Sequence, residues 1–451
     1  MKKLLLNLFL FCGLSLIGFT AFGQGVTTSA INGKVTSDGG EELPGATVIA
    51  IHQPSGTQYG TVTDLNGFYR ISNMRVGGPY KITITFVGYS AYERDNAFLQ
   101  LGQTLSISPK LQESSTQLDE VVVTAGGIID GNRTGAQEVV DLARINSTPT
   151  LGRSIGDFAR FTPQAKIDEG GDGLSISIAG INNRLNAIYI DGAVNNDVFG
   201  LAGSGTNGGQ TGVSPISLDA IEQFQIAIAP FDVRQSGFAG GSINAITRSG
   251  TNEVEGSAYY LFRNEGLAAE TPGGLTSGER EQLPEFSAET YGFRVGGPIV
   301  KDKAFFFVNA EFQRDETPQP FNLENYNGDI LPRDTDGNIV PGGLDQARAT
   351  INNLVSFLNN NFGYDPGTFE NNTAFLESDK IIAKFDFNLT DRHKLTARHS
   401  YTRAENLEAR SSNPFGLNFI NGSEFFISTT NSSAVELRSS YNNFSNLLTV
   451  G

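Results

Sequence analysis

The stretch "KDKAFFFVNAEFQRD", residues 301–315, places three consecutive phenylalanines inside a chain of 451 residues whose formal net charge is −16. From position 304 onward, apolar and polar side chains alternate. The apolar set is Ala304, Phe306, Val308, Ala310 and Phe312, and the polar set is Asn309, Glu311 and Gln313. A period of two predicts a β-strand with one apolar and one polar face. Either a protein core or lipid can cover such an apolar face.

The composition narrows the classes of protein. The chain has 53 glycines against 17 prolines, which is typical of many turns and β-structure. Its acidic balance, with a sequence pI near 4.7, excludes nucleic acid as a partner, because phosphate binding needs clustered Lys and Arg. The single cysteine, Cys12, lies in the apolar leader. The mature chain is therefore expected to have neither a disulfide nor a thiolate metal site.

Residues 1–23 predict a signal peptide. Two lysines precede an apolar stretch from Leu4 to Phe19, and small residues stand before a cut after Gly23. An uncleaved membrane anchor is the competing interpretation, which the ending Ala-Phe-Gly disfavours. Past position 23, no stretch approaches the roughly 20 apolar residues that a transmembrane helix needs.

Residues 28–113 predict a small β-sandwich of roughly seven short strands separated by turn residues. In the fifth of these, 79–88, apolar and polar residues alternate from Tyr80 to Phe86, so one face is buried. The stretches "GKVTSDGGEELPGATVIA" and "GTVTDLNGFYRI" resemble the carboxypeptidase regulatory-like domain, which implies an accessory immunoglobulin-like module. The segment 64–69, "DLNGFY", is interpreted as an ordinary turn and not as a metal loop.

The segment "LDEVVVTAGG", residues 118–127, has two interpretations. It is either the last strand of the sandwich or an extended peptide that adds to the sheet edge of a partner. It resembles the TonB box of outer-membrane receptors, which implies TonB and its inner-membrane energising complex as partners. The residues that carry this resemblance are Asp119, Glu120, Val121, Val122, Val123, Thr124 and Ala125.

Residues 126–250 resemble the plug domain of TonB-dependent receptors. The similarity lies in "GRSIGDFARFTPQAKI", "LNAIYIDG" and "SPISLDAIEQFQIAIAPFDVRQSGFAGGSINAITRSGTN". The segments 185–192 and 221–228 are expected to be short buried strands, and "GSGTNGG" a loop. Among these receptors, the sequence of this region is most similar to the Oar-like branch. The polysaccharide-importing SusC branch usually has "GYGTQ" after its valines, where this chain has Ala125-Gly126-Gly127.

Loop lengths indicate what covers the opening strand. Candidate strands lie at 254–263, 286–296, 303–314, 378–390, 394–403, 431–441 and from 445 onward. The connections between them alternate strictly between long and short. Outer-membrane barrels alternate in this way, because their periplasmic turns are tight and their extracellular loops are long. We therefore expect the face of Phe306 to contact lipid, and the polar face to line a lumen.

The predicted fold class is mainly β: an N-terminal immunoglobulin-like sandwich, an α+β plug domain, and, over 251–451, the N-terminal portion of a large antiparallel transmembrane barrel. A barrel that holds a plug needs about 22 strands, and an open sheet would expose unpaired edges to lipid. We therefore expect a longer receptor, of which this chain is a part. The amphipathic stretch 344–363 predicts a helix that packs on an extracellular loop.

Enzyme functions find no support in the sequence. Its three histidines are His52, His393 and His399, and no nucleophile elbow, paired-histidine motif or phosphate loop is visible. The motif "DTDGN", Asp334–Asn338, has its glycine two positions too early for an EF-hand. We expect no catalytic residue, cofactor or metal site.

The predicted function is uptake of an unknown ligand across the outer membrane of a Gram-negative cell, energised through TonB, with the sandwich in the periplasm. Outer-membrane lipid, and potentially a surface lipoprotein, would be further partners. One alternative is an Oar-like barrel for adhesion or secretion. A second is a SusC-like oligosaccharide importer with carbohydrate binding.

Overall fold

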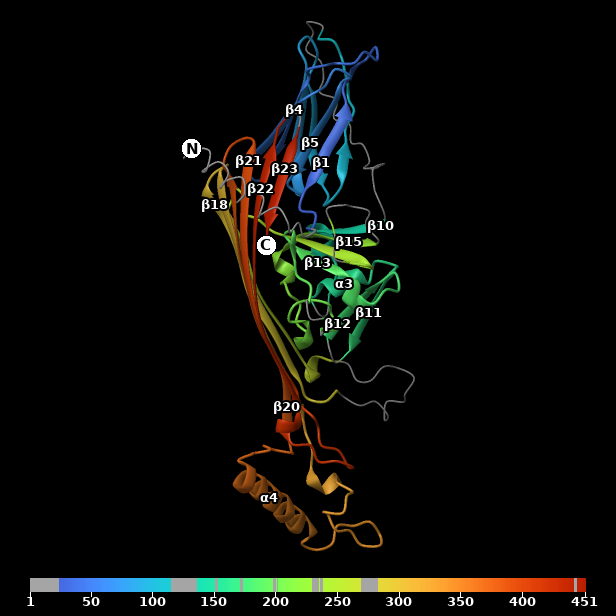
Figure 1. The fold of residues 1–451 in the computed structure, drawn as a ribbon, viewed down its shortest axis with the longest axis vertical. Coiled ribbons are helices and arrows are strands. Elements are labelled where there is room, and N and C mark those ends of the chain that lie inside the picture. Colours follow the sequence, from blue (N-terminus) through green and yellow to red (C-terminus); the bar gives the residue numbers. More distant parts are fainter. Residues whose placement is uncertain are drawn as a thin grey trace, which may run out of the picture.

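The computed structural model describes residues 24–114, 136–268 and 283–451, apart from the short stretches 151–152, 171–172, 198–199, 201, 229–234, 236–237 and 442–443. Three parts follow one another along the chain (Figure 1). The N-terminal sandwich, 24–114, stands at one end. The plug domain, 136–247, lies against the concave face of a long curved sheet. This sheet, built from 255–450, is called the wall sheet below.

The N-terminal sandwich packs a four-stranded sheet on a three-stranded one. The sheets have the orders β4-β3-β6-β7 and β5-β1-β8, and β2 and β9 form a further short pair. The strands are β1 Ser29–Lys34, β2 Thr36–Ser37, β3 Thr47–His52, β4 Thr57–Val62, β5 Phe68–Met74, β6 Gly77–Thr85, β7 Tyr92–Leu99, β8 Thr104–Ser106 and β9 Lys110–Leu111.

The predicted alternation in β6 is confirmed, because Tyr80, Ile82 and Ile84 are fully buried in the sandwich core. The predicted turn at 64–69 is present as well. The Asp64 carboxylate accepts hydrogen bonds from the backbone N–H groups of Asn66 and Phe68, so this side chain closes its own turn.

The plug domain is a five-stranded sheet, order β10-β15-β16-β13-β14, with a separate hairpin of β11 and β12. Strands β13 and β16 run parallel, and the other neighbours are antiparallel. Both predicted plug strands form, as β13 and β15. The elements are β10 Ala136–Asp141, α2 Leu142–Ser147, α3 Ile155–Ala159, β11 Ala165–Gly170, β12 Gly173–Ile178, η1 Asn183–Leu185, β13 Ala187–Ile190, β14 Ala193–Val194, η2 Gly209–Thr211, η3 Leu218–Ala220, β15 Ile221–Ile228 and β16 Gly241–Thr247.

The wall sheet contains seven antiparallel strands in sequence order, as the alternating loop lengths predicted. Its strands are β17 Glu255–Asn264, β18 Ser287–Val300, β19 Ala304–Gln319, β20 Asn372–Asn388, β21 His393–Glu408, β22 Glu424–Ser440 and β23 Ser445–Val450. The long connections carry η4 Glu265–Leu267, η5 Leu323–Asn325, α4 Gly343–Phe362 and η6 Ile420–Gly422. The sandwich stands on the short-turn side, and α4 on the long-loop side (Figure 1).

The two faces of the wall sheet differ as predicted. On the concave face, Phe307 packs into the core of the plug domain, and Glu311 bonds a plug serine. On the convex face, Phe306 pairs with Phe385, and the large apolar side chains there remain exposed. A contiguous exposed apolar surface of this extent is typical of contact with lipid.

An aromatic row marks one limit of the convex apolar band. Tyr260, Tyr291 and Phe312 stack side by side, with ring centroids 6.5 and 5.4 Å apart. Beyond them the convex face carries Arg314 and Glu377, which lie within 3.8 Å of each other. In β19 the band therefore covers 304–312, close to the 9–11 residues with which a tilted strand crosses a bilayer.

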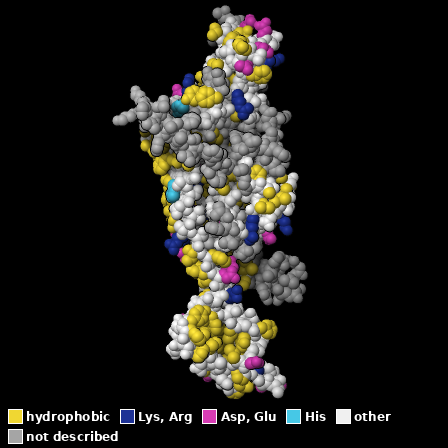
Figure 2. All heavy atoms as spheres, in the orientation of Figure 1, with side chains coloured by type: hydrophobic (Ala, Val, Ile, Leu, Met, Phe, Trp, Pro, Cys, Tyr) yellow, Lys and Arg dark blue, Asp and Glu magenta, His cyan; other side chains and the backbone are white. Residues whose placement is uncertain are grey.

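Helix α4 forms one residue from its predicted bounds and packs on its own long loop. Ala347 and Ile351 are buried against Leu323 and Leu331. Figure 2 shows apolar side chains on the outer surface of this lobe, and Leu354, Phe357 and Phe362 are exposed there. Among the described residues, no helix is long and apolar enough to cross a membrane.

The two faces predict different responses to a new charge. A charge on the lipid face near the bilayer midplane costs about 2–4 kcal/mol. Val308→Arg should therefore reduce the amount of folded full-length protein in the outer membrane. The control is Gln313→Arg, which lies on the concave face beside open space, one residue past the band, because Asn309 is only 1% exposed. A normal amount of folded Val308→Arg would show that the face assignment is wrong.

The buried histidine of the sandwich predicts an acid sensitivity. Burial, followed by the positive charge of Arg75, lowers the pKa of His52 to about 2. The unfolded chain takes up a proton below its ordinary pKa of about 6.5, and the folded sandwich does not. Its stability should therefore fall as the pH drops below 6.5, by on the order of 1 kcal/mol per pH unit. Hydrogen exchange of the β3 amides measures this effect, and His52→Gln should remove most of the slope.

Candidate functional site at the plug–wall interface

The interface between the plug domain and the wall sheet buries several charged side chains. Those of the wall that face the plug are at most 6% exposed; they are Glu311, Lys380, Lys384, Arg398 and Glu436. A buried charge is costly unless it is paired and hydrogen-bonded. The partners of these side chains therefore decide how the plug is held.

Asp191 is the plug residue at the centre of the first ionic cluster. It stands in the two-residue turn between β13 and β14, where Asp191 and Gly192 have φ angles of 47° and 80°. Two successive positive φ values are typical of a type I′ hairpin turn, for which Asp-Gly is a preferred sequence. The turn projects the Asp191 carboxylate towards the wall sheet.

Two cations of the wall meet this carboxylate. Asp191 Oδ1 lies 3.5 Å from Lys384 Nζ, and Oδ2 lies 3.2 Å from Arg398 Nε. Thr247 of the plug adds hydrogen bonds to Asp191 from its backbone N–H, at 2.9 Å, and from its hydroxyl, at 2.7 Å. Burial alone would raise the pKa of Asp191, but Lys384 and Arg398 hold it below its ordinary value.

Both cations also bond the plug backbone. Lys384 Nζ donates to the carbonyl of Thr247 at 2.9 Å, and Arg398 donates to the carbonyl of Ile190 at 3.2 Å. The cluster therefore joins β20 and β21 of the wall to β13 and β16 of the plug. It is a structural lock, because two cations of the wall share one carboxylate of the plug across the interface.

A second cluster lies further towards the long-loop side, around Glu311 of β19. Its carboxylate accepts hydrogen bonds from Lys380 Nζ at 2.9 Å, from the Tyr259 hydroxyl at 2.6 Å and from Ser217 Oγ at 2.9 Å. Arg153 of the plug stacks on the ring of Tyr259, with its guanidinium carbon 4.6 Å from the ring centre. The cluster thus connects the plug to β17, β19 and β20.

A cavity of about 500 Å³ opens beside this second cluster. It lies between plug residues 145–154 and 212–219 and the long-loop halves of β17–β20. Its charged lining residues are of both signs: Arg153, Asp219, Arg263, Glu311, Asp315 and Lys380. Volume and lining suit a polar ligand that carries both charges.

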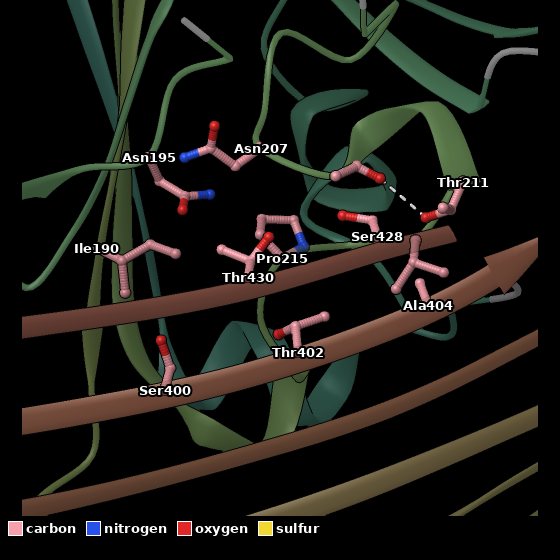
Figure 3. A pocket seen from close by; sticks show the side chains of 12 residues that line it. Ile190, Asn195, Asn207, Thr211, Pro215, Ser400, Thr402, Ala404, Ser428 and Thr430 are labelled. Carbon is pink, nitrogen blue, oxygen red and sulfur yellow. Dashed lines mark hydrogen bonds between the residues drawn. The ribbon is translucent and has the colours of Figure 1, made fainter. Parts of the chain in front are cut away.

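The opposite side of the plug is closed against β21 and β22 (Figure 3). Ser400, Thr402 and Thr430 point from the wall towards the plug loop, and the space left is only about 10 Å³. Gly208 makes this approach possible, because a Cβ there would lie 2.7 Å from Ser428 Oγ. A gap of this size is too small for a ligand.

The predicted site residues Asp119, Glu120, Val121, Val122, Val123, Thr124 and Ala125 lie outside the described residues, as does the predicted signal peptide 1–23. Asp334 of "DTDGN" forms a turn, accepting from the backbone N–H groups of Asp336 and Asn338. Within the described part of the chain, no group of three His, Cys, Asp or Glu side chains is placed to hold a metal ion.

The three histidines lie apart. His52 bonds Ser55 inside the sandwich, His393 bonds Ser439 beside a short turn, and His399 bonds Ser433 on the convex face of the wall. The predicted sharing of a face by His399 with Leu395 and Ala397 agrees with the strand register.

Comparison with known proteins agrees with this architecture. Residues 246–448 match the model of the outer membrane beta barrel domain, and residues 30–112 match that of the carboxypeptidase regulatory-like domain. The TonB-dependent transporter Oar of Myxococcus xanthus is 28% identical over 357 residues, which is 72% of this chain and 31% of that protein.

The chain is similar to TonB-dependent outer-membrane receptors. The probable TonB-dependent siderophore receptor PirA of Acinetobacter baumannii is 26% identical over 173 residues, 36% of this chain and 21% of the relative. The crystal structure of the siderophore receptor PirA from Acinetobacter baumannii superposes with a TM-score of 0.45 and 16% identity, over 69% of this chain and 39% of that one. The chain thus spans about a third or less of the length of these curated relatives. Its place is the outer membrane.

Neutralising Asp191, the plug carboxylate of this lock, should strongly reduce the stability with which the plug is held. Asp191→Asn leaves two buried cations without a counter-charge, which costs about 3–5 kcal/mol. Hydrogen exchange of the β16 amides in the full-length protein should report this loss. Glu424→Gln is the control, because the side chains of Glu424 and of its ion-pair partner Arg410 are both more than half exposed.

The same experiment can be repeated as a function of pH. Since the folded pKa of Asp191 is lowered, its contribution is complete above the ordinary pKa of 3.8 and is lost only in stronger acid. Protection of β16 should therefore not change between pH 8 and pH 5 through this residue. Equal protection in Asp191→Asn and wild type would show that the ion pairs do not hold the plug.

Proposed function

We propose that this chain is the N-terminal part of a TonB-dependent transporter that takes up a polar ligand across the outer membrane. The observation that carries the proposal is a plug held against the wall by the buried ion pairs of Asp191, with a charged cavity of about 500 Å³ on its long-loop side. Ion pairs and hydrogen bonds can be exchanged for water, so a plug held in this way can move or rearrange. An apolar seal would resist entry of water.

The cavity supports a ligand with charges of both signs. Three cationic and three anionic side chains line it, and Glu311 and Lys380 belong both to the cavity and to the second cluster. A ligand that pairs with Glu311 competes with the Ser217 hydroxyl, through which the plug bonds this carboxylate. Ligand binding would in this way weaken the attachment of the plug to β19.

The energy source in this proposal is TonB, captured by residues 119–125. This segment begins five positions after Ser114, whose backbone N–H bonds the carbonyl of Gly88 in the sandwich, and ends eleven positions before Ala136, the first residue of β10. A peptide that connects two domains can add as a strand to the sheet edge of a partner. A pull on it reaches the plug through β10, an edge strand of the plug sheet.

The same tests distinguish the proposed function from its alternatives. We assign no enzyme activity, since the relatives named above are transporters and receptors. The Oar similarity also accommodates an adhesion or secretion-associated barrel, and a surface lipoprotein partner remains part of the proposal. A barrel with such a role would differ in cargo and direction, and a SusC-like oligosaccharide importer would differ in cargo alone. Energy dependence is the property that identifies TonB coupling.

The box predicts a local effect of proline. Proline at Val122 removes a backbone donor from the strand that TonB would pair with. Val122→Pro should abolish binding of the isolated TonB C-terminal domain to the full-length receptor, with normal insertion into the outer membrane. Asn132→Pro, in the same connection but outside the box, is the control and should bind normally. Normal binding by Val122→Pro would refute the assignment of residues 119–125.

A further inference from the structure

The N-terminal sandwich and the segment before it close the plug from the periplasmic side. Residues 24–28 run between the plug and the wall, and Thr27 is only 3% exposed. The backbone N–H of Gly25 donates to the carbonyl of Gly192 at 3.1 Å. Asn244 of β16 donates from its amide to the carbonyl of Val26 at 2.5 Å. The segment therefore bonds the same plug turn that carries Asp191.

The same segment also bonds the wall. The Thr27 hydroxyl donates to the carboxylate of Glu436 on β22, and the amide of Gln24 donates to the carbonyl of Thr449 on β23 at 2.6 Å. Gly25 has no room for a side chain, because a Cβ there would lie 2.5 Å from that of Tyr189. Residues 24–28 thus fill a narrow slot between the plug and the wall.

The sandwich itself docks on the plug through two buried glutamines. Gln223 accepts from the backbone N–H of Leu101 at 3.1 Å and donates to the carbonyl of Leu99 at 3.3 Å. Gln225 donates to the carbonyl of Leu101 at 3.2 Å. Both glutamines lie on one face of β15, and Phe224 between them points into the plug core. One face of the plug sheet is therefore specific for the sandwich.

The β3–β4 hairpin of the sandwich rests on the short turns of the wall. The backbone N–H of Asn252 donates to the carbonyl of Pro54 at 2.8 Å, and the amide of Asn388 donates to Thr57 Oγ1 at 3.0 Å. Lys394 lies over the ring of Tyr59, with its ammonium 4.4 Å from the ring centre. The sandwich thus contacts plug and wall at the same time.

These contacts are mainly polar, which bears on whether they can open. The apolar cluster shared by the segment, the sandwich and the plug has four members: Val26, Val76, Leu101 and Ile246. Polar groups regain hydrogen bonds to water when such an interface opens, so its net stability is modest. The interface has the character of a reversible contact.

We propose that residues 24–28 and the sandwich form a periplasmic latch, which holds the plug in the closed state and must leave before the plug can move. This proposal rests on the transport function proposed above. The proposed box, 119–125, lies between the sandwich and the plug in the sequence. A single pull on the box therefore loads both attachments, and the latch opens through the same force that acts on β10.

The test measures access to the slot with a small hydrophilic maleimide, so it needs no knowledge of the ligand. The full-length protein is used in its outer membrane, with any other cysteine replaced by serine. Thr27→Cys reports the latch, Thr211→Cys, 1% exposed in the wild type, reports the plug, and Leu65→Cys, 87% exposed, reports free access. At rest, position 27 should react at least about tenfold more slowly than position 65.

Energisation of the inner membrane should accelerate labelling at position 27, and Val122→Pro should abolish the acceleration. A disulfide between Thr57→Cys and Asn388→Cys, whose side chains touch, should also abolish it until reductant is added. The control pair is Leu65→Cys with Asn388→Cys, because Leu65 lies at the opposite end of the sandwich from the β3–β4 hairpin. This pair should not cross-link.

Four results would overturn the latch. Fast labelling of position 27 at rest would show that the segment is not seated, and acceleration with the disulfide closed would show that sandwich release is not required. Acceleration at position 211 without acceleration at position 27 would refute the latch and leave TonB-coupled transport standing. Absence of acceleration at both positions would refute the coupling to TonB and the latch with it.

Discussion

Charged side chains on the inner face of a membrane sheet cannot remain buried without partners, and the position of the plug domain follows from this requirement. Lys384 and Arg398 of the wall would each be costly alone, and Asp191 supplies the counter-charge. The Asp-Gly turn holds this carboxylate in place, and Thr247 satisfies its remaining lone pairs. Electrostatic pairing therefore sets the register of the plug against the wall, and apolar contacts such as that of Phe307 complete the interface.

Much of the fold could be predicted, because it depends on local patterns. Alternation of apolar and polar residues located all seven wall strands, and amphipathic periodicity located α4. The strands were predicted too short on the long-loop side. In β20, residues 372–377 lie outside the predicted strand, since no apolar face is required beyond the lipid. In the sandwich, β7 could not be predicted from its sequence, YERDNAFL. A run of polar residues there interrupts the alternation that indicates a strand.

The candidate site was less predictable, because its contacts join residues far apart in the chain. The alternation in β20 predicts a common face for Lys384 and Asp386, but no local pattern indicates that Asp191 lies opposite Lys384. Likewise, Gln223 and Gln225 have the spacing of one strand face, which is compatible with solvent as well as with the sandwich. A signal that could have been used is the rarity of paired glutamines in an otherwise apolar strand. The polar positions of a buried strand indicate a docking face, but they do not identify its partner.

The length of the wall strands has a consequence for what meets the cell surface first. Strands β20 and β22 contain 17 residues each, and about 9–11 residues suffice to cross the hydrocarbon layer. At about 3.3 Å per residue and a tilt of about 45°, the remaining six to eight residues of each strand extend on the order of 14–19 Å outward. The lobe with α4 is therefore raised above the lipid headgroups. Leu354, Phe357 and Phe362 are exposed on it, so this lobe presents apolar side chains at a distance from the membrane.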